Sequence, residues 1–89
     1  MFEKIKDPDH LVKTKAEFIE IVESFLEGEI EGSDCIAVYF ELPGLEDVEI
    51  IINPRVNVAT KLEYYTKMYN DNLELNANSA VKIIGVSTL

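Results

Sequence analysis

The stretch CIAVYFEL, residues 35–42, decides the fold, because its apolar side chains alternate with the period of two that a half-buried strand requires. One face of this strand carries Ile36, Val38, Phe40 and Leu42. The next two residues, Pro43 and Gly44, are typical of a turn. The run VEIII, residues 48–52, predicts a second strand whose alternate residues Val48, Ile50 and Ile52 share a face. We therefore expect an antiparallel hairpin with a loop of about four to five residues.

A long amphipathic helix is predicted before the hairpin, over residues 8–27. Asp7 can accept free amide protons as its N-cap, and Pro8 fits the first helical position, where a missing N–H costs nothing. Gly28 offers the left-handed residue that commonly ends a helix. The apolar residues that recur at three- and four-residue steps are Leu11, Val12, Phe18, Ile19, Val22, Phe25 and Leu26.

A second helix is predicted after the hairpin. Asn53 and Pro54 repeat the cap pattern, with Asn57 as an alternative cap, and the helix is expected to end near residues 70–72. Its apolar stripe consists of Val58, Leu62, Tyr65 and Tyr69. Beyond it, residues 73–75 predict a short extended piece and residues 81–86 a third strand.

The resulting order of elements is α-β-β-α-β, in a single domain that spans residues 1–89. Because the second helix connects strands two and three, these two strands are expected to run parallel, with a right-handed connection. The simplest arrangement is a three-stranded sheet of order 2-1-3 with both helices on one face. The fold class is therefore α+β, a two-layer sandwich.

Acidic residues dominate the middle of the chain. Residues 16–54 contain no Lys, Arg or His, and their eleven acids are Glu17, Glu20, Glu23, Glu27, Glu29, Glu31, Asp34, Glu41, Glu46, Asp47 and Glu49. The whole chain has a net charge of −9 from 17 acids and 8 bases. Such a charge repels phosphate, so direct binding to nucleic acid or to an anionic membrane is not expected.

Six of these acids form the first candidate site. Carboxylates three and four residues apart on a helix lie close together, so the helix and the loop after it predict an acidic ridge of Glu20, Glu23, Glu27, Glu29, Glu31 and Asp34. The ridge has three interpretations. It is a solvated helix face, a substitute for a nucleic-acid backbone at the basic surface of a partner protein, or a binding surface for divalent cations.

The tyrosines of the second helix divide into two groups. Tyr65 and Tyr69 lie on the apolar stripe and are expected in the core. Tyr64 faces away from that stripe together with Lys61 and Met68, so Tyr64 and Met68 are a candidate partner-binding surface or peripheral packing.

Arg55, the only arginine, lies in the first turn of the second helix, where the dipole disfavours positive charge. We expect a carboxylate of the hairpin to compensate it, namely that of Glu46, Asp47 or Glu49.

Catalytic and metal-binding patterns are weak. Asp7, Asp9 and His10 form an acid and histidine cluster, but helix capping explains Asp7, and the helix dipole suits Asp9. The single cysteine, Cys35, excludes an intrachain disulfide and a multi-cysteine zinc site, and it suits a small buried position. A nucleophilic pair of Cys35 and His10 would require the two segments to meet. We expect no enzyme activity, no cofactor and no metal.

Residues 52–65 (INPRVNVATKLEYY), 69–75 (YNDNLEL) and 81–85 (VKIIG) resemble a family of small uncharacterised proteins encoded by phages and prophages of Gram-positive bacteria. In that family an Asn-Pro-Arg turn leads into a helix with Lys-Leu-x-Tyr-Tyr, followed by Leu-x-Leu and a terminal strand. The resemblance covers about 35 residues at the C-terminal end. It implies a small accessory protein that acts on host enzymes by binding them.

The start of the chain lacks the apolar core of a signal peptide, and no apolar run approaches the roughly 20 residues of a membrane span. We expect a cytoplasmic protein, in the host cell if phage-encoded, with no membrane partner. The function expected is non-enzymatic binding to a host protein with a basic surface, in competition with nucleic acid. The alternative is a structural or assembly module that self-associates.

Overall fold

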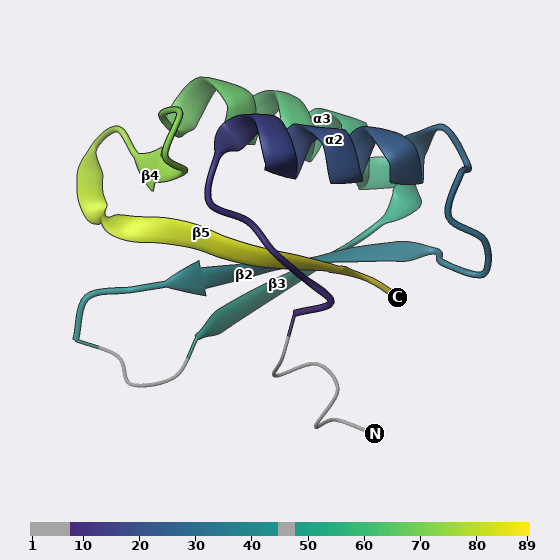
Figure 1. Ribbon diagram of the computed structural model, residues 1–89, viewed down its shortest axis with the longest axis horizontal. Helices are drawn as coiled ribbons and strands as arrows, with labels where there is room; N and C mark the ends of the chain where they lie inside the picture. Colours follow the sequence, from purple (N-terminus) through teal and green to yellow (C-terminus); the bar gives the residue numbers. More distant parts are fainter. Residues whose placement is uncertain (1–7, 45–47) are drawn as a thin grey trace.

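Two helices lie side by side on one face of a five-stranded sheet (Figure 1) in the computed structural model, which describes residues 8–44 and 48–89. The elements in chain order are β1 (His10–Leu11), α2 (Lys15–Leu26), β2 (Cys35–Glu41), β3 (Glu49–Pro54), α3 (Arg55–Met68), β4 (Glu74–Leu75) and β5 (Asn78–Thr88). The predicted α+β class and the placement of both helices on one face are confirmed.

The sheet has the strand order β1-β5-β2-β3, and β4 pairs with β5 beside this path. All the pairs are antiparallel. Since β3 and β5 both run antiparallel to β2, they are parallel to each other. The long strands β3, β2 and β5 thus keep the predicted relative order, but a sheet of three strands is wrong. β4 falls within the short extended piece predicted at residues 73–75, whereas β1, only two residues long and too short for a periodic pattern, was not predicted.

The first helix begins later than predicted. Residues 8–13 are not helical; instead His10 pairs with Val86 at the β5 edge. The N-cap is Thr14, whose side chain accepts a hydrogen bond from the Glu17 amide at 3.2 Å, while the Glu17 carboxylate accepts one from the Thr14 amide at 3.0 Å. This reciprocal capping box satisfies two amides that would otherwise lack a partner. Asp7, the predicted cap, lies outside the described residues.

The predicted end of the first helix is confirmed. Gly28 follows the last residues of α2 with a φ of 79°. Its amide donates to the Phe25 carbonyl at 3.1 Å, and the Glu29 amide donates to the Ser24 carbonyl at 3.0 Å. These two bonds close the end of the helix, and the positive φ requires glycine because a Cβ would be strained there.

The second helix is confirmed, but its cap is not Asn53. The N-cap position is Pro54, without a side-chain hydrogen bond, and Asn53 is buried within β3. The two helices run antiparallel and are held at both ends. Lys15 Nζ donates to the Thr66 carbonyl at 2.9 Å at one end, and Arg55 reaches the last turn of α2 at the other.

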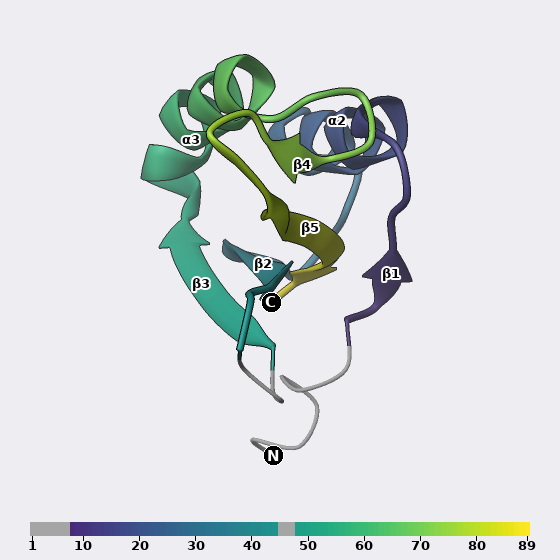
Figure 2. The same cartoon turned by 90° about the vertical axis from the view of Figure 1, so that its left-hand side faces the viewer.

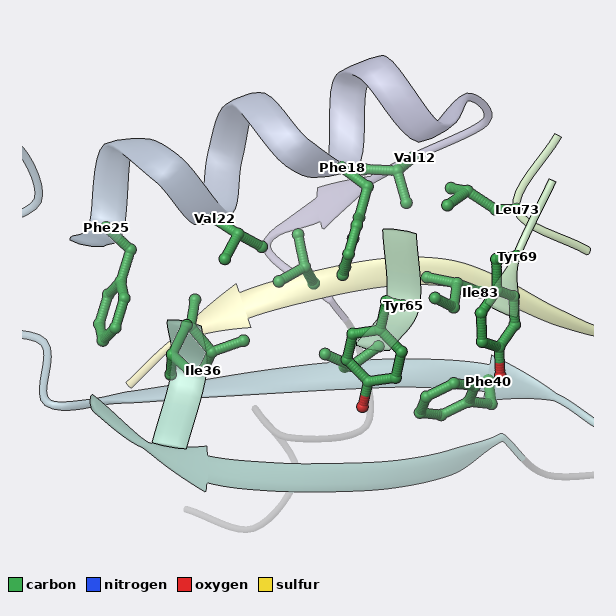
Figure 3. Packing of buried hydrophobic residues seen from close by; sticks show 13 residues of the cluster. Val12, Phe18, Val22, Phe25, Ile36, Phe40, Tyr65, Tyr69, Leu73 and Ile83 are labelled. Atoms are coloured by element: carbon green, nitrogen blue, oxygen red, sulfur yellow. The ribbon is translucent and has the colours of Figure 1, made fainter. Parts of the chain in front are cut away.

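The core fills the space between the helices and the sheet (Figure 3). Its buried residues are Val12, Phe18, Val22, Phe25, Ile36, Val38, Phe40, Val58, Tyr65, Tyr69, Leu73, Ile83 and Val86. The predicted core positions of Tyr65 and Tyr69 are confirmed. The Tyr65 ring packs edge-on against Phe18 and Tyr69, with centroids 5.7 and 5.8 Å away. Such edge-to-face pairs are favourable beyond the area that they bury.

The other face of the sheet is partly covered by the segment that leads into β1. The Asp9 amide donates to Ser87 Oγ at 2.8 Å, and Ser87 Oγ donates to the Tyr39 hydroxyl at 3.2 Å. Gly85 permits this close approach, because a Cβ there would lie 2.5 Å from the Cβ of Pro8. Ser87 and Tyr39 are therefore buried beneath the chain rather than facing solvent.

Candidate binding surfaces

The residues of the acidic ridge are exposed along α2 and the loop after it. Glu20, Glu23 and Glu27 lie on the side of α2 that points away from the core, because Phe18, Val22 and Phe25 occupy the opposite side. With Glu29, the three glutamates line one shallow depression, whose floor includes Ile19. Glu31 and Asp34 are exposed farther along the loop and do not line this depression. The structure thus brings four of the six ridge residues together.

No ridge carboxylate forms an ion pair within residues 8–44 and 48–89. The ion pair found in this part of the chain joins Lys67 and Glu63 at 3.5 Å on the surface of α3. Successive acids on α2 therefore repel one another with only solvent and counter-ions to screen them.

The helix dipole adds to this repulsion. The carboxyl end of a helix carries partial negative charge, and the last turn of α2 contains no basic residue. Glu23, Glu27 and Glu29 gather at this end. Carboxylates at the amino end would be favourable, as Glu17 is in the capping box, so half of the ridge residues lie where the helix dipole disfavours them.

Arg55 offsets part of this charge from the neighbouring helix. Its Nη1 atom donates to the Phe25 carbonyl at 2.7 Å and its Nη2 atom to the Ser33 carbonyl at 3.1 Å, while the guanidinium carbon lies 4.0 Å from the centre of the Phe25 ring. The compensation predicted for Arg55 thus comes from backbone carbonyls. No described carboxylate pairs with it, Glu49 included, whereas Glu46 and Asp47 lie outside the described residues.

A second surface lies between α3 and the β2–β3 hairpin. Tyr64 is 48% exposed and lines an apolar hollow of about 280 Å³, and Met68, 38% exposed, lies one turn farther along the helix. The hollow is also lined by Phe40, Leu42, Glu49, Ile51, Lys61, Tyr65, Tyr69 and Val81. Lys61 lies over the Tyr64 ring, with its Nζ 5.8 Å from the ring centre.

The two buried phenols at this hollow are poor acids. Burial raises the pKa of Tyr65 from 10.0 to about 12, and the neighbouring Tyr69 and Tyr64 add to the shift. Burial also raises the pKa of Tyr69, with Tyr64 adding to it. Both phenols are therefore neutral near pH 7 and present hydroxyl groups rather than charges to the hollow.

A smaller cavity of about 10 Å³ lies beneath α3, lined by Asn53 among apolar side chains such as Val58 and Leu62. It has room for about one water molecule. This cavity is too small for a substrate or a cofactor.

The catalytic pair considered for Cys35 and His10 does not form. His10 is opposite Val86, and Val86 is opposite Val38, so the strand of His10 lies two positions away from β2 in the sheet. Cys35 lies three residues before Val38, which adds about 10 Å along the strand direction. Their side chains also point to opposite faces of the sheet. Among the residues that the structure describes, no group of three or more His, Cys, Asp or Glu could hold a metal ion, and no helix is long and apolar enough to cross a membrane.

Sequence reasoning named Tyr64, which lines the hollow, and Met68, which is exposed nearby without lining it, but missed the strand side of the hollow. The sequence signal for this strand side was the run Ile50-Ile51-Ile52, because a strand with one solvated face would alternate apolar and polar residues. Ile51 lies opposite Val38, whose side chain faces the helices, and is therefore directed to α3, whereas Ile50 and Ile52 point to the other face.

Comparison of the chain with protein-family models, with curated proteins and with solved structures gives no match.

Proposed function

We propose that this protein is a non-enzymatic binding module that engages a basic surface of another protein through the acidic ridge. The observation that carries the proposal is the clustering of exposed carboxylates at the carboxyl end of α2, none of which forms an ion pair within the described residues. Glu20, Glu23, Glu27 and Glu29 share one depression, and Glu31 and Asp34 extend the charge along the loop.

The loss of folding stability that comes from carboxylates at the carboxyl end of α2 supports a role beyond solubility. A solvated face keeps a protein soluble equally well when its charges are dispersed or placed at the amino end of a helix. Here Glu27 and Glu29 stand at the disfavoured end. Residues that lower the stability of the fold are typical of functional sites.

The chemistry of the ridge indicates the kind of partner. Closely spaced carboxylates present negative charge in the way that a phosphate backbone does, so a groove that binds nucleic acid is a complementary surface. The net charge of −9 opposes direct binding to nucleic acid itself. With the resemblance to phage and prophage proteins, these features support an accessory protein that acts in the cytoplasm of a bacterial host, where it competes with nucleic acid for a host protein.

The experiment compares three forms of the protein immobilised on a resin. The ridge variant carries Glu20→Gln, Glu23→Gln and Glu27→Gln, and the matched control carries Glu41→Gln, Glu63→Gln and Asp71→Asn, three exposed acids outside the ridge. Both variants change the net charge by the same three units. A lysate of a Gram-positive bacterium is passed over each resin at low and at moderate salt.

We expect the wild type and the control to retain the same host protein, the ridge variant to lose it, and added double-stranded DNA to displace it. Thermal unfolding checks that the ridge variant is folded, and removing acids from the carboxyl end of α2 should leave its stability equal or higher. Retention of no specific protein by the wild type, or of the same protein by all three resins, would contradict the proposal.

A further inference from the structure

The outer strand β3 is an apolar edge. It is the last strand in the order β1-β5-β2-β3, so nothing among the described residues pairs with its outer side, and it forms the margin of the sheet in Figure 2. Its centre is the run Ile50-Ile51-Ile52, in which Ile51 is 40% and Ile52 is 46% exposed. Edge strands are commonly protected by charges, by proline or by shortness. In β3 the charge and the proline, Glu49 and Pro54, lie only at the two ends.

The hydrogen bonds of the neighbouring strands show which backbone groups of this edge are free. The Arg55 amide donates to the Asp34 carbonyl at 2.8 Å on the β3 side of β2, whereas Cys35 and Leu89 exchange bonds of 3.0 and 2.9 Å on the β5 side. In an antiparallel ladder these directions alternate from residue to residue. Ile51 therefore points its N–H and C=O toward Val38 of β2, and Ile50 and Ile52 point theirs outward.

The exposed side chains of α3 lie next to this edge. Figure 2 shows α3 above β3, and α2 on the opposite side of the molecule above β1. Ile51 and Tyr64 line the same hollow, and Met68 lies one turn beyond Tyr64. The backbone edge and an apolar helix stripe are thus presented side by side.

We propose that β3 pairs with β3 of a second copy of this chain in an antiparallel, two-fold symmetric dimer. The two-fold axis passes between the two Ile51 residues. In this register Ile50 of each copy exchanges hydrogen bonds with Ile52 of the other, which satisfies all four outward N–H groups. The two Ile51 side chains meet in a non-hydrogen-bonded pair, where opposing side chains are closest. The dimer joins two sheets into one continuous sheet.

Two features favour a second copy over a foreign strand. The register places Glu49 opposite the uncharged Asn53 of the other copy, so that no like charges face each other across the pair. The symmetry also brings the second Tyr64 and Met68 toward the first pair, whereas a lone peptide would leave this stripe exposed. The acidic ridges, which would oppose association, lie on α2 away from the axis (Figure 2).

The test uses opposite charges at the symmetry axis. Ile51→Lys and Ile51→Glu each place like charges against each other in the homodimer, and each should weaken self-association at least about tenfold. An equimolar mixture of the two variants should restore a heterodimer, which a misfolded variant could not form. Val56→Lys and Val56→Glu are the matched controls, because Val56 is 83% exposed and lies outside the hollow.

Light scattering across a concentration series measures the assembly, and amide exchange measured by NMR locates it. The amides of Ile50 and Ile52 should become protected only at high concentration, whereas that of Ile51 stays protected throughout. A wild type that remains monomeric at millimolar concentration would overturn the proposal, as would a dimer that both Ile51 variants leave intact. Protection of Ile50 and Ile52 by an added extended peptide, with the chain monomeric, would assign the edge to a foreign strand instead.

Discussion

Arg55 tests how the two helices are held together at the carboxyl end of α2. Replacing it by alanine removes two hydrogen bonds, one to the Phe25 carbonyl at 2.7 Å and one to the Ser33 carbonyl at 3.1 Å, and the stacking on the Phe25 ring. It also removes the positive charge that faces the negative end of the helix dipole. The substitution therefore acts on α2, on the loop after it and on the start of α3.

The size of the effect follows from these contacts. Hydrogen bonds from a charged donor contribute about 1.5 kcal/mol each at the lower end of their range, which suits a half-buried side chain. Stacking of a guanidinium on an aromatic ring adds about 0.5 kcal/mol in a partly exposed site. We therefore expect Arg55→Ala to lower the free energy of unfolding by about 3.5 kcal/mol. Arg55→Lys keeps the charge but not the planar fork, so it should lose about half as much.

Urea denaturation followed by circular dichroism measures both variants at low and at high salt. Because most of the expected loss comes from hydrogen bonds to carbonyls, most of it should persist at high salt, where only the charge contribution is screened, whereas the loss of an ion pair would disappear. A loss below about 1 kcal/mol, or a loss that disappears at high salt, would refute this role of Arg55.

Two further predictions concern the capping box and the buried phenols. Thr14→Ala should lower the free energy of unfolding by about 1 kcal/mol and Thr14→Ser by much less, because the hydroxyl accepts a hydrogen bond from the Glu17 amide. Equal losses for the two variants in urea denaturation would contradict this role of Thr14. The pKa of Tyr65 is about 12 in the folded chain and 10.0 in the reference state, so the folded chain holds this proton longer and stability falls as the pH rises from 10 to 12. Thermal unfolding across this range should show a shallower fall for Tyr65→Phe, and identical slopes for the two proteins would show that Tyr65 is not the cause.

The central part of the fold could be predicted because local patterns determine it. The alternation in residues 35–42 and the turn at Pro43 identified the hairpin, and Gly28 marked the end of the first helix. The helix between β3 and β5 implied that these strands are parallel, because such a connection returns the chain in the same direction. These features depend on residues close together in the sequence.

The parts of the fold that could not be predicted depend on contacts between residues that are far apart in the sequence. Leu11 and Val12 fit the helical spacing of the apolar residues after them, but the pairing of His10 with Val86 determines the conformation of this segment. The Thr14-x-x-Glu17 pattern of a capping box is present in the sequence, but the Asp7-Pro8 pair predicts an earlier start. For Arg55, the dipole correctly indicated a need for compensation. The compensating group is the carbonyl end of α2. It could be identified only from the antiparallel packing of the two helices.

The candidate sites also divide into a part that local sequence patterns predict and a part that depends on distant residues. The spacing of Glu20, Glu23 and Glu27 predicted their common exposed face, since it depends on helical geometry alone. The hollow beside Tyr64 could not be predicted, because its other wall is Ile51 on an edge strand. Which strand forms the edge is decided by the order of the whole sheet.

The most direct test of the acidic ridge is the affinity of the captured host protein for the wild type, the ridge variant and the matched control, measured by titration calorimetry over a range of salt concentrations. We expect the ridge variant to bind at least about tenfold more weakly than the control and to show a smaller salt dependence, with DNA competing against the wild type. Equal affinities and equal salt dependence for the ridge variant and the control would contradict the account.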